Sequence, residues 1–191
     1  MSPRPAPDLD LRRAQITRLA RDVAEGEGWP AVTVRRLSVE LGVTQPVLYS
    51  AFTGRQDVID AVALEGFVAL GAALEAADAT ALARMQSYLD FAAAHPHTYE
   101  AMFSMPSQLG FAANSHEPLM RAFAAIQDVL PPAVDDAEAG EARAEVAWAM
   151  LHGLATLQAS GRLPALRTRA RLEAAHRMLV DTGRGVPARL R

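Results

Sequence analysis

The sequence contains no cysteine among its 191 residues, which excludes disulfide bonds and metal sites that depend on thiolates. It contains no lysine either, so all 19 basic residues are arginines, a bias that by itself indicates no function. The longest uncharged stretches, 101–116 and 146–161, are too short to span a bilayer and carry polar residues. The start, MSPRPAPD, lacks the basic and apolar regions of a secretion signal. We therefore expect a soluble, cytoplasmic protein that does not enter a membrane.

The alternation of apolar and polar residues that is typical of strands is not evident in the chain. Alanine is abundant, whereas glycine and proline number only 12 each, and this composition favours helices. An all-α fold is therefore predicted. The length allows a small N-terminal module and a larger helical domain with its own core, so we expect two domains, residues 8–54 and 55–191.

Residues 33–52, TVRRLSVELGVTQPVLYSAF, have the pattern of two short helices joined by a bend. Apolar residues recur at helical spacing on both sides of Gly42, which suits the left-handed conformation that often follows a helix. Thr33 and Thr44 precede the two apolar stripes and are candidate N-caps. The stretch therefore predicts a helix-turn-helix, whose second helix, roughly residues 44–52, belongs in the major groove of DNA.

Polar groups remain exposed on this motif once its apolar residues are directed inward. Arginine, tyrosine and small polar side chains contact phosphates and base edges in DNA complexes. Because helix-bend-helix patterns also occur in ordinary all-α cores, the DNA-binding prediction depends on these exposed groups. They are Arg35, Arg36, Thr44, Gln45, Tyr49, Ser50 and Arg55.

The stretch TVRRLSVELGVTQPVLYSAFTGRQDVI resembles the DNA-binding domain of the tetracycline repressor (TetR) family, and the likeness covers about residues 12–60. It lies in T-V-R, in the turn G-V-T, in L-Y-x-x-F of the second helix and in a basic residue that opens the next helix. The resemblance implies a homodimeric transcription regulator. It also implies that Tyr49 and Arg55 contact phosphates and that Arg35 lies at the groove edge. We expect a repressor that a small molecule releases from a near-palindromic operator.

The remaining polar residues of the second helix complete the expected DNA contacts. We assign Gln45 and Ser50 to base edges or contacts close to them, and Thr44 to a phosphate. Pro46 departs from the small residue often found at this position in the family. It suits a first helical turn but supplies no hydrogen-bond donor, so the number of bases that this short helix reads stays open.

The net charge of −3 is unevenly distributed along the chain. Residues 1–55 hold eight arginines and six acidic residues, an excess of +2, whereas residues 56–191 hold eleven arginines and sixteen acidic residues, an excess of −5. The positive excess therefore lies with the helix-turn-helix, but it is weak. Affinity for DNA should depend on a few placed contacts and on dimerisation more than on a general basic surface.

Further helices are predicted on both sides of the motif. A first helix begins at about Leu9 and ends near residues 26–28, and Trp29 after it is read as core. Its arginines form a solvated face, although the family resemblance lets the start of this helix approach a phosphate. They are Arg12, Arg13, Arg18 and Arg21. The other expected helices span 55–78, 80–94, 97–104, 117–130, 142–161 and 168–181, with an acidic connection at 135–141.

The last two predicted helices carry the longest apolar surface, and 142–161 is apolar nearly all round. In the TetR family the last two long helices pair with their copies in a second subunit as a four-helix bundle. A two-fold dimer needs a self-complementary surface, which this one can supply. The expected interface residues are Leu154, Leu157, Leu172 and Leu179.

Two segments of this half, FAAAHPHTYEAMF and WAMLHGLATLQASGRL, more narrowly resemble a C-terminal domain named for its Trp-His-Gly residues, here Trp148, His152 and Gly153. Aromatic and methionine side chains in this half are either plain core or the wall of a cavity. Arginine is sparse between residues 80 and 161, so a cavity would favour a largely apolar effector over a multiply charged phosphate. The expected lining residues are Tyr99, Phe103, Phe123, Gln127, Trp148 and His152.

Other classes of site are disfavoured. His95 and His97 lie two residues apart across a proline and do not share a helical face, so no metal or cofactor is expected. No nucleophile elbow or phosphate-binding glycine loop is present. The alternative function is an all-α small-molecule carrier or enzyme in which the helix-turn-helix is only structural. Exposed groups at Tyr49 and Arg55 argue against it, since a packing element has no need of them.

Overall fold

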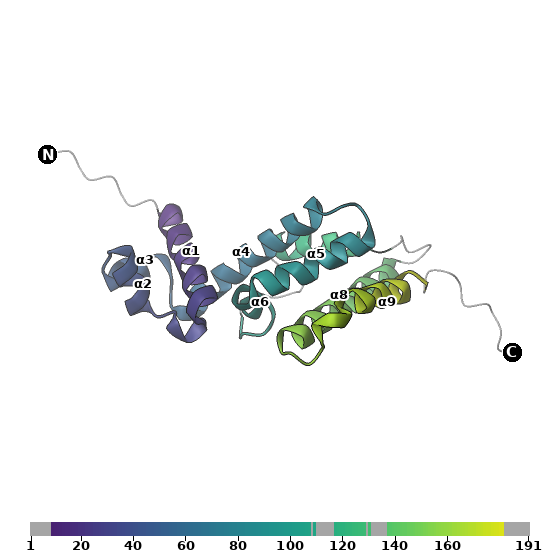
Figure 1. Cartoon of the computed structure of the whole chain (residues 1–191). Coiled ribbons are helices and arrows are strands. Elements are labelled where there is room, and N and C mark those ends of the chain that lie inside the picture. The colour runs from purple at the N-terminus through teal and green to yellow at the C-terminus, as the bar shows by residue number, and fades with distance from the viewer. Residues whose placement is uncertain (1–8, 108, 110–116, 129, 131–136, 182–191) are drawn as a thin grey trace. The chain divides into compact units, whose positions relative to one another are not determined.

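The computed structural model describes residues 9–107, 109, 117–128, 130 and 137–181 of the chain. These residues form nine α-helices and two short 3-10 helices and contain no strand, which confirms the all-α prediction (Figure 1). The helices form two compact units, Met1–Phe67 with His95–His116 and Val68–Ala94 with Glu117–Arg191. This division differs from the predicted domains 8–54 and 55–191, because it falls inside helix α4 (Arg55–Ala76).

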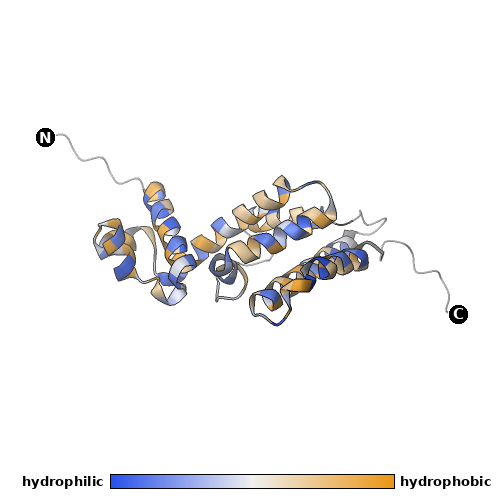
Figure 2. Ribbon diagram, in the orientation of Figure 1, coloured by the Kyte–Doolittle hydropathy of each residue, from blue (hydrophilic) through white to orange (hydrophobic). Residues whose placement is uncertain are grey.

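The first unit is built around α1 (Leu9–Glu27), which carries both apolar and polar residues (Figure 2) and buries one face. Ile16 and Ala20 of this face are fully buried, and α1 packs against α2, α3 and α6. Trp29 is 3% exposed, which confirms its place in the core. The other elements of this unit are η1 (Trp29–Ala31), α2 (Val34–Leu41), α3 (Gln45–Ala51), the first part of α4, and α6 (Pro96–Phe103).

Helix α6 joins the first unit through a carboxylate of α1. Its N-cap residue, His95, makes no side-chain capping bond, and Pro96 occupies the first turn. Glu25 supplies the missing acceptor: its two oxygens accept the amides of His97 at 3.3 Å and Thr98 at 2.8 Å, and one also accepts the Thr98 hydroxyl at 2.7 Å. An anionic acceptor at a helix N-terminus satisfies amides that have no partner within the helix.

In the second unit, α5 (Ala81–Ala94) packs against α8 (Ala137–Ala159) and α9 (Thr168–Asp181), and α7 (Glu117–Gln127) packs against α8. Helix α5 ends at Ala94, before His95-Pro96, as predicted. Helices α8 and α9 form a hairpin with η2 (Ala165–Arg167) at its turn (Figure 1).

The predicted start of α8 at residue 142 was wrong, because the helix begins at Ala137. The acidic residues Glu138 and Glu141, read as part of a connecting loop, continue the helix toward its N-terminus. Carboxylates are favoured in the first turn of a helix, so the acidic run extends this helix instead of ending it. Residues 135–136 of the predicted connection lie outside the described residues.

Candidate nucleic-acid interface

Helices α2 and α3 form the predicted helix-turn-helix. The hydroxyl of Thr33 accepts the amide of Arg36 at 3.1 Å and so caps α2. Gly42 follows α2 in the left-handed conformation, at φ 64° and ψ 33°. The amide of Val43 then donates to the carbonyl of Ser38 at 3.0 Å and closes the turn. Two sequence signals, a capping threonine and a glycine after the helix, therefore fix the bend as expected.

Thr44 occupies the N-cap position of α3, but its hydroxyl makes no capping bond, which corrects the predicted role of this hydroxyl. An N-cap side chain bonds the second or third amide of its helix. Here the second residue is Pro46, which has no N–H, and the third amide, of Val47, donates to the Thr44 carbonyl at 3.0 Å. The Thr44 hydroxyl therefore has no amide to cap and lies on an exposed residue.

The polar residues of α3 are exposed around a buried anchor. Leu48 is 3% exposed, whereas Tyr49 is 56% exposed, and Gln45, Pro46 and Ser50 are also exposed. The Ser50 hydroxyl donates to the carbonyl of Val47 at 2.7 Å. Its oxygen can still accept a hydrogen bond from a bound molecule. Gln45 and Ser50, predicted to read base edges, and Tyr49, predicted to bind a phosphate, therefore share one short helix. Their contacts with DNA remain predictions.

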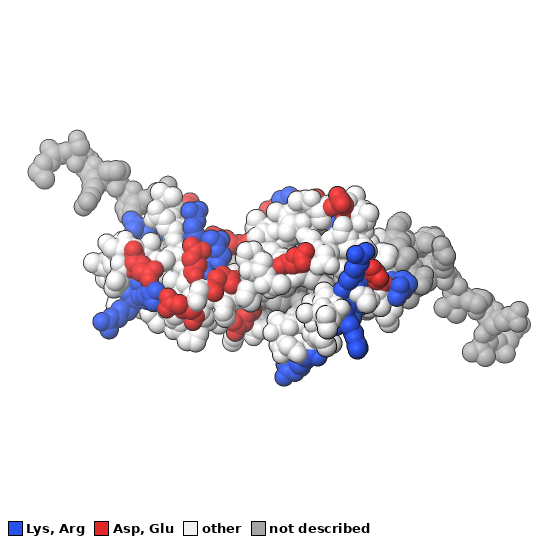
Figure 3. Space-filling view, viewed as in Figure 1, with Lys and Arg blue, Asp and Glu red and all other residues white. Residues whose placement is uncertain are grey.

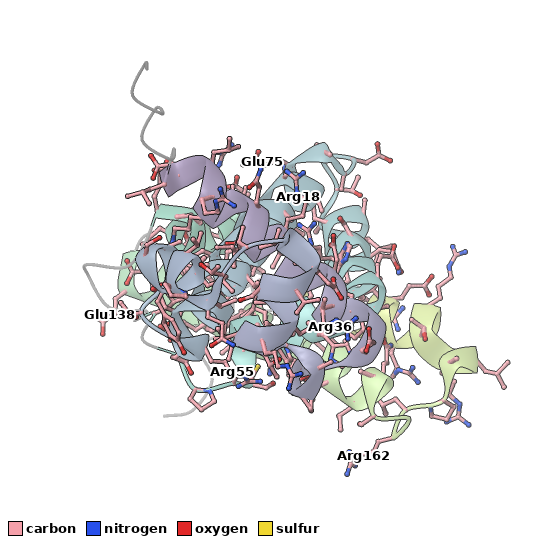
Figure 4. All side chains as sticks on the ribbon, turned by 90° about the vertical axis from the view of Figure 1, so that its left-hand side faces the viewer. Arg18, Arg36, Arg55, Glu75, Glu138 and Arg162 are labelled. Carbon is pink, nitrogen blue, oxygen red and sulfur yellow. The ribbon has the colours of Figure 1, made fainter. Side chains whose placement is uncertain are left out.

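The arginines of this unit differ in their hydrogen bonds. Arg55, at the start of α4, donates to the carbonyl of Trp29 at 3.0 Å, which occupies one of its five donors. Arg36 bonds both Glu27, at 2.7 Å, and Glu40, and its pKa is raised by these carboxylates. Figure 4 views this unit from the side of α2 and α3, with Arg36 and Arg55 labelled. Arg35 is exposed.

Basic and acidic side chains are interspersed over the part of α1 to α3 visible in Figure 3. The ion pairs of Arg13 with Asp57, Arg21 with Glu65 and Arg36 with Glu27 explain part of this pattern. Such pairing reduces the general electrostatic attraction of a surface for phosphates. The geometry therefore agrees with the weak positive excess of the sequence.

Two residues that hold helices of the first unit together were not identified from the sequence. Arg13 was read as part of a solvated face, but it bonds the end of α3 and the start of α4. Glu25 was assigned no role, but it caps α6. Their partners lie 38 to 73 positions away along the chain, so no local spacing could have revealed them.

The residues predicted to line a ligand cavity belong to both compact units. In the first unit, Tyr99 and Phe103 of α6 pack with ring centroids 4.7 Å apart, and Phe103 meets the ring of Phe67 edge-on at 5.3 Å. In the second unit, Phe123 and Trp148 meet edge-on at 6.3 Å. Gln127 and His152 also belong to the second unit. A cavity formed by this set remains a prediction.

His152 lies on α8 and is half-buried. Its pKa is lowered because burial disfavours the charged imidazolium. A neutral imidazole offers one donor and one acceptor nitrogen, which suits an uncharged polar group of a ligand better than an anion. The largely apolar effector remains a prediction.

The leucines predicted for the dimer interface do not share one environment. Leu157 is 41% exposed and Leu154 is half-buried on α8, whereas Leu172 and Leu179 of α9 are only 2% and 7% exposed. The two α9 leucines are covered by their own chain because α9 packs against α5 and α8. They offer little surface to a second subunit. If α9 takes part in the predicted dimer interface, other residues of this helix must make the contacts.

Neither a membrane span nor a metal site is found in the described part of the chain. None of its helices combines the length and the apolar character needed to cross a bilayer. Among the same residues, no three side chains of histidine, aspartate or glutamate gather in a way that could hold a metal ion.

Comparisons with known proteins agree with this geometry. Residues 16–62 match the family described as bacterial regulatory proteins of the tetR family, and residues 81–182 match the tetracyclin repressor-like C-terminal domain. No curated protein matches the sequence.

Solved structures share the fold at low sequence identity. The protein SCO4313 is 21% identical, with a TM-score of 0.70 over 94% of this chain and 100% of its own. A protein with unknown function from Rhodococcus sp. RHA1 is 26% identical, with a TM-score of 0.64 over 94% of this chain and 97% of its own. A tetR-family transcriptional regulator from Streptomyces coelicolor is 16% identical, with a TM-score of 0.57 over 89% of this chain and 78% of its own.

Proposed function

Because the chain belongs to the tetracycline repressor family of DNA-binding transcriptional regulators, we propose that it is a homodimeric repressor of a near-palindromic operator, released by a largely apolar small molecule. Members of this family are transcription factors and not enzymes. DNA binding, effector binding and dimerisation are general in the family. The operator, the chemistry of the effector and the sign of regulation are the parts that we propose.

The observation that carries the proposal is the contrast between the two faces of α3. Leu48 is buried, and Phe52 directly after the helix is 3% exposed. These two side chains pack α3 against the rest of the first unit. Gln45 and Tyr49 are exposed on the same helix. A helix that only filled a core would have no reason to present an amide and a phenol to solvent, whereas a helix in the major groove uses such groups.

Two DNA-binding domains are needed because one short helix contacts few base pairs. Helix α3 has only seven residues, and Pro46 removes one backbone donor from it. A two-fold dimer would place two copies of α3 on half-sites about one helical turn, or a multiple of it, apart. The operator should therefore be a near-palindrome.

The apolar effector is supported by the composition of the second unit. Phe123 and Trp148 contact each other there, and His152 nearby on α8 is kept toward its neutral form by burial. Arg121 is engaged by Glu75 at 3.0 Å, which leaves it less suited to binding an anionic ligand. The narrower resemblance to the Trp-His-Gly type of C-terminal domain is part of this proposal.

The test is selection of double-stranded DNA from a random library with the purified protein, followed by sequencing of the recovered DNA. A near-palindromic consensus is expected, and its affinity should fall when apolar compounds are titrated into the complex. Recovery of unrelated sequences, with equal binding to random duplexes at physiological salt, would remove the operator proposal. A consensus that no compound in a broad apolar set releases would remove only the effector part.

A further inference from the structure

Arg13 of α1 contacts both α3 and α4, the two helices joined by the turn at residues 52–54. Its Nη1 donates to the carbonyl of Ala51 at 2.6 Å, and its Nη2 donates to Oδ1 of Asp57 at 2.5 Å. The guanidinium carbon also lies 4.1 Å from the centroid of the Phe52 ring, within the range of a cation–π contact. One side chain of α1 therefore binds the last residue of α3, the residue after it and the first turn of α4.

The Ala51 contact acts on the C-terminal end of α3. The last carbonyls of a helix have no hydrogen-bond donor within it. A cationic side chain is well suited to donate to them. Helix α3 has seven residues, which is too short to be stable alone in water. Its direction therefore depends on contacts with the rest of the unit, and the Arg13 bond is a contact at its carbonyl end.

Asp57 connects the same cluster to the turn between α3 and α4. Its Oδ2 accepts the amide of Thr53 at 2.9 Å and the hydroxyl of Thr53 at 3.3 Å. Arg13 lowers the pKa of Asp57, so the carboxylate is charged at neutral pH. Arg13, Asp57 and Thr53 thus hold both the end of α3 and the turn that follows it.

We propose that Arg13 is a positioning residue for DNA binding, which sets the direction of α3 through Ala51, Phe52 and Asp57 without contacting DNA itself. The inference rests on the proposed function only in that α3 reads the operator. A displaced α3 would lose its base contacts, whereas Arg55, the arginine predicted to bind a phosphate, lies on α4. Loss of Arg13 should therefore reduce discrimination between operator and random DNA more than it reduces general affinity.

The experiment compares Arg13→Met, Asp57→Asn and the double variant, measuring affinity for operator and for random duplex over a range of salt concentrations. Methionine keeps an apolar stem against Phe52 but removes the donors. Arg13→Met and Asp57→Asn should each lower the operator-to-random affinity ratio by about tenfold. The salt slope should not change, and the double variant should be no worse than Arg13→Met alone because the two residues act as one unit.

Arg18→Met is the matched control, since Arg18 is an exposed arginine of the same helix. It should leave the affinity ratio unchanged. All measurements are made well below the melting temperature of each variant, and Arg13→Lys, which keeps the charge but not the fork of donors, replaces Arg13→Met if the latter does not fold.

The proposal is overturned if Arg13→Met weakens both duplexes equally and lowers the salt slope by about one, while Asp57→Asn binds like wild type. That pattern would make Arg13 a phosphate contact. Absence of any operator preference in the wild-type protein would instead contradict the proposed function, so the two failures are distinguishable.

Discussion

At the scale of single residues, arginines that the sequence equally predicts to be exposed have different hydrogen-bond partners in the structure. Arg36 is held by two carboxylates, Glu27 and Glu40, whereas Arg55 donates to a backbone carbonyl and has further donors for the phosphate that we propose it binds. Pairing of this kind depends on which acidic residues the fold brings near. The residue type alone therefore does not decide which arginine binds DNA.

Arg55→Ala is expected to weaken binding to operator and random DNA alike and to reduce the salt slope by about one, because it removes the phosphate contact that we propose for Arg55. Gln45→Ala should instead change the preference at one base pair by about 1–3 kcal/mol. The control is Arg36→Ala combined with Glu40→Gln, which removes one charge of each sign and should alter the slope less. Fluorescence anisotropy at several salt concentrations measures all three; a Tyr49→Phe/Arg55→Ala protein that binds like wild type would contradict the assignment.

Protonation of His152 should make stability depend on pH. Its folded pKa lies below the unfolded value of about 6.5, so the unfolded chain binds the proton more readily. The contribution to stability is complete above pH 6.5 and is lost as the pH falls through the folded pKa. His152→Gln should therefore flatten the decrease in the free energy of unfolding below about pH 6.5. Urea unfolding across this range measures it, with His95→Gln, at an exposed residue, as the control; identical pH profiles for wild type and His152→Gln would count against it.

At the scale of elements, the glycines of α4 show how packing decides what sequence leaves open. A glycine inside a helix can serve either close packing or a bend, and α4 contains two, Gly66 and Gly71. A Cβ on Gly66 would lie 2.7 Å from both Met102 Sδ and Thr98 Cγ2, so this glycine permits α6 to pack closely on α4. A Cβ on Gly71 would lie 3.8 Å from its nearest neighbour, an ordinary contact, so this glycine serves no close approach.

Gly66→Ala should lower the free energy of unfolding by about 1–2 kcal/mol despite the better helix propensity of alanine. Met102 can move its flexible end, but Thr98 is branched at Cβ and its hydroxyl is bonded to Glu25, so it yields less easily. Gly71→Ala in the same helix is the matched control and should raise stability by up to about 1 kcal/mol. Thermal or urea unfolding decides between them, and a stabilised Gly66→Ala protein would disprove the close packing of α4 on α6.

Helix bounds were predictable wherever local signals were strong. Gly42, Thr33 and His95-Pro96 mark ends that the structure reproduces. The start of α8 was missed because an acidic run suits both a loop and a helix N-terminus. The cap of α6 by Glu25 joins residues 72 and 73 positions apart, and its detection requires the fold.

At the scale of the whole molecule, the family and the all-α class follow from the sequence, because the helix-turn-helix pattern is local and repeats known spacing. The surface that a second subunit would bind does not follow from the sequence. Helical periodicity alone cannot tell which apolar face of a helix packs within its own chain and which stays exposed. On α8, Val146, Ala149 and Leu157 are exposed in one stripe at helical spacing, and Gly153 within it faces open space. On α9, Met178 is 65% exposed, whereas Leu172 and Leu179 are buried.

Replacing leucines on these two faces should therefore give two different outcomes. Leu157→Asp places a charge on the exposed stripe, so it should yield folded monomers. Their operator affinity should be reduced because the two DNA-binding domains are no longer linked. Leu179→Asp buries a charge within the subunit and should instead unfold the second unit. Val68→Asp, at an exposed residue of α4 outside the stripe, is the control and should remain dimeric. Sedimentation velocity and circular dichroism at micromolar concentration separate these results. A dimeric Leu157→Asp protein with wild-type affinity would move the interface away from this face of α8, whereas a folded, monomeric Leu179→Asp protein would restore the buried leucines of α9 to it.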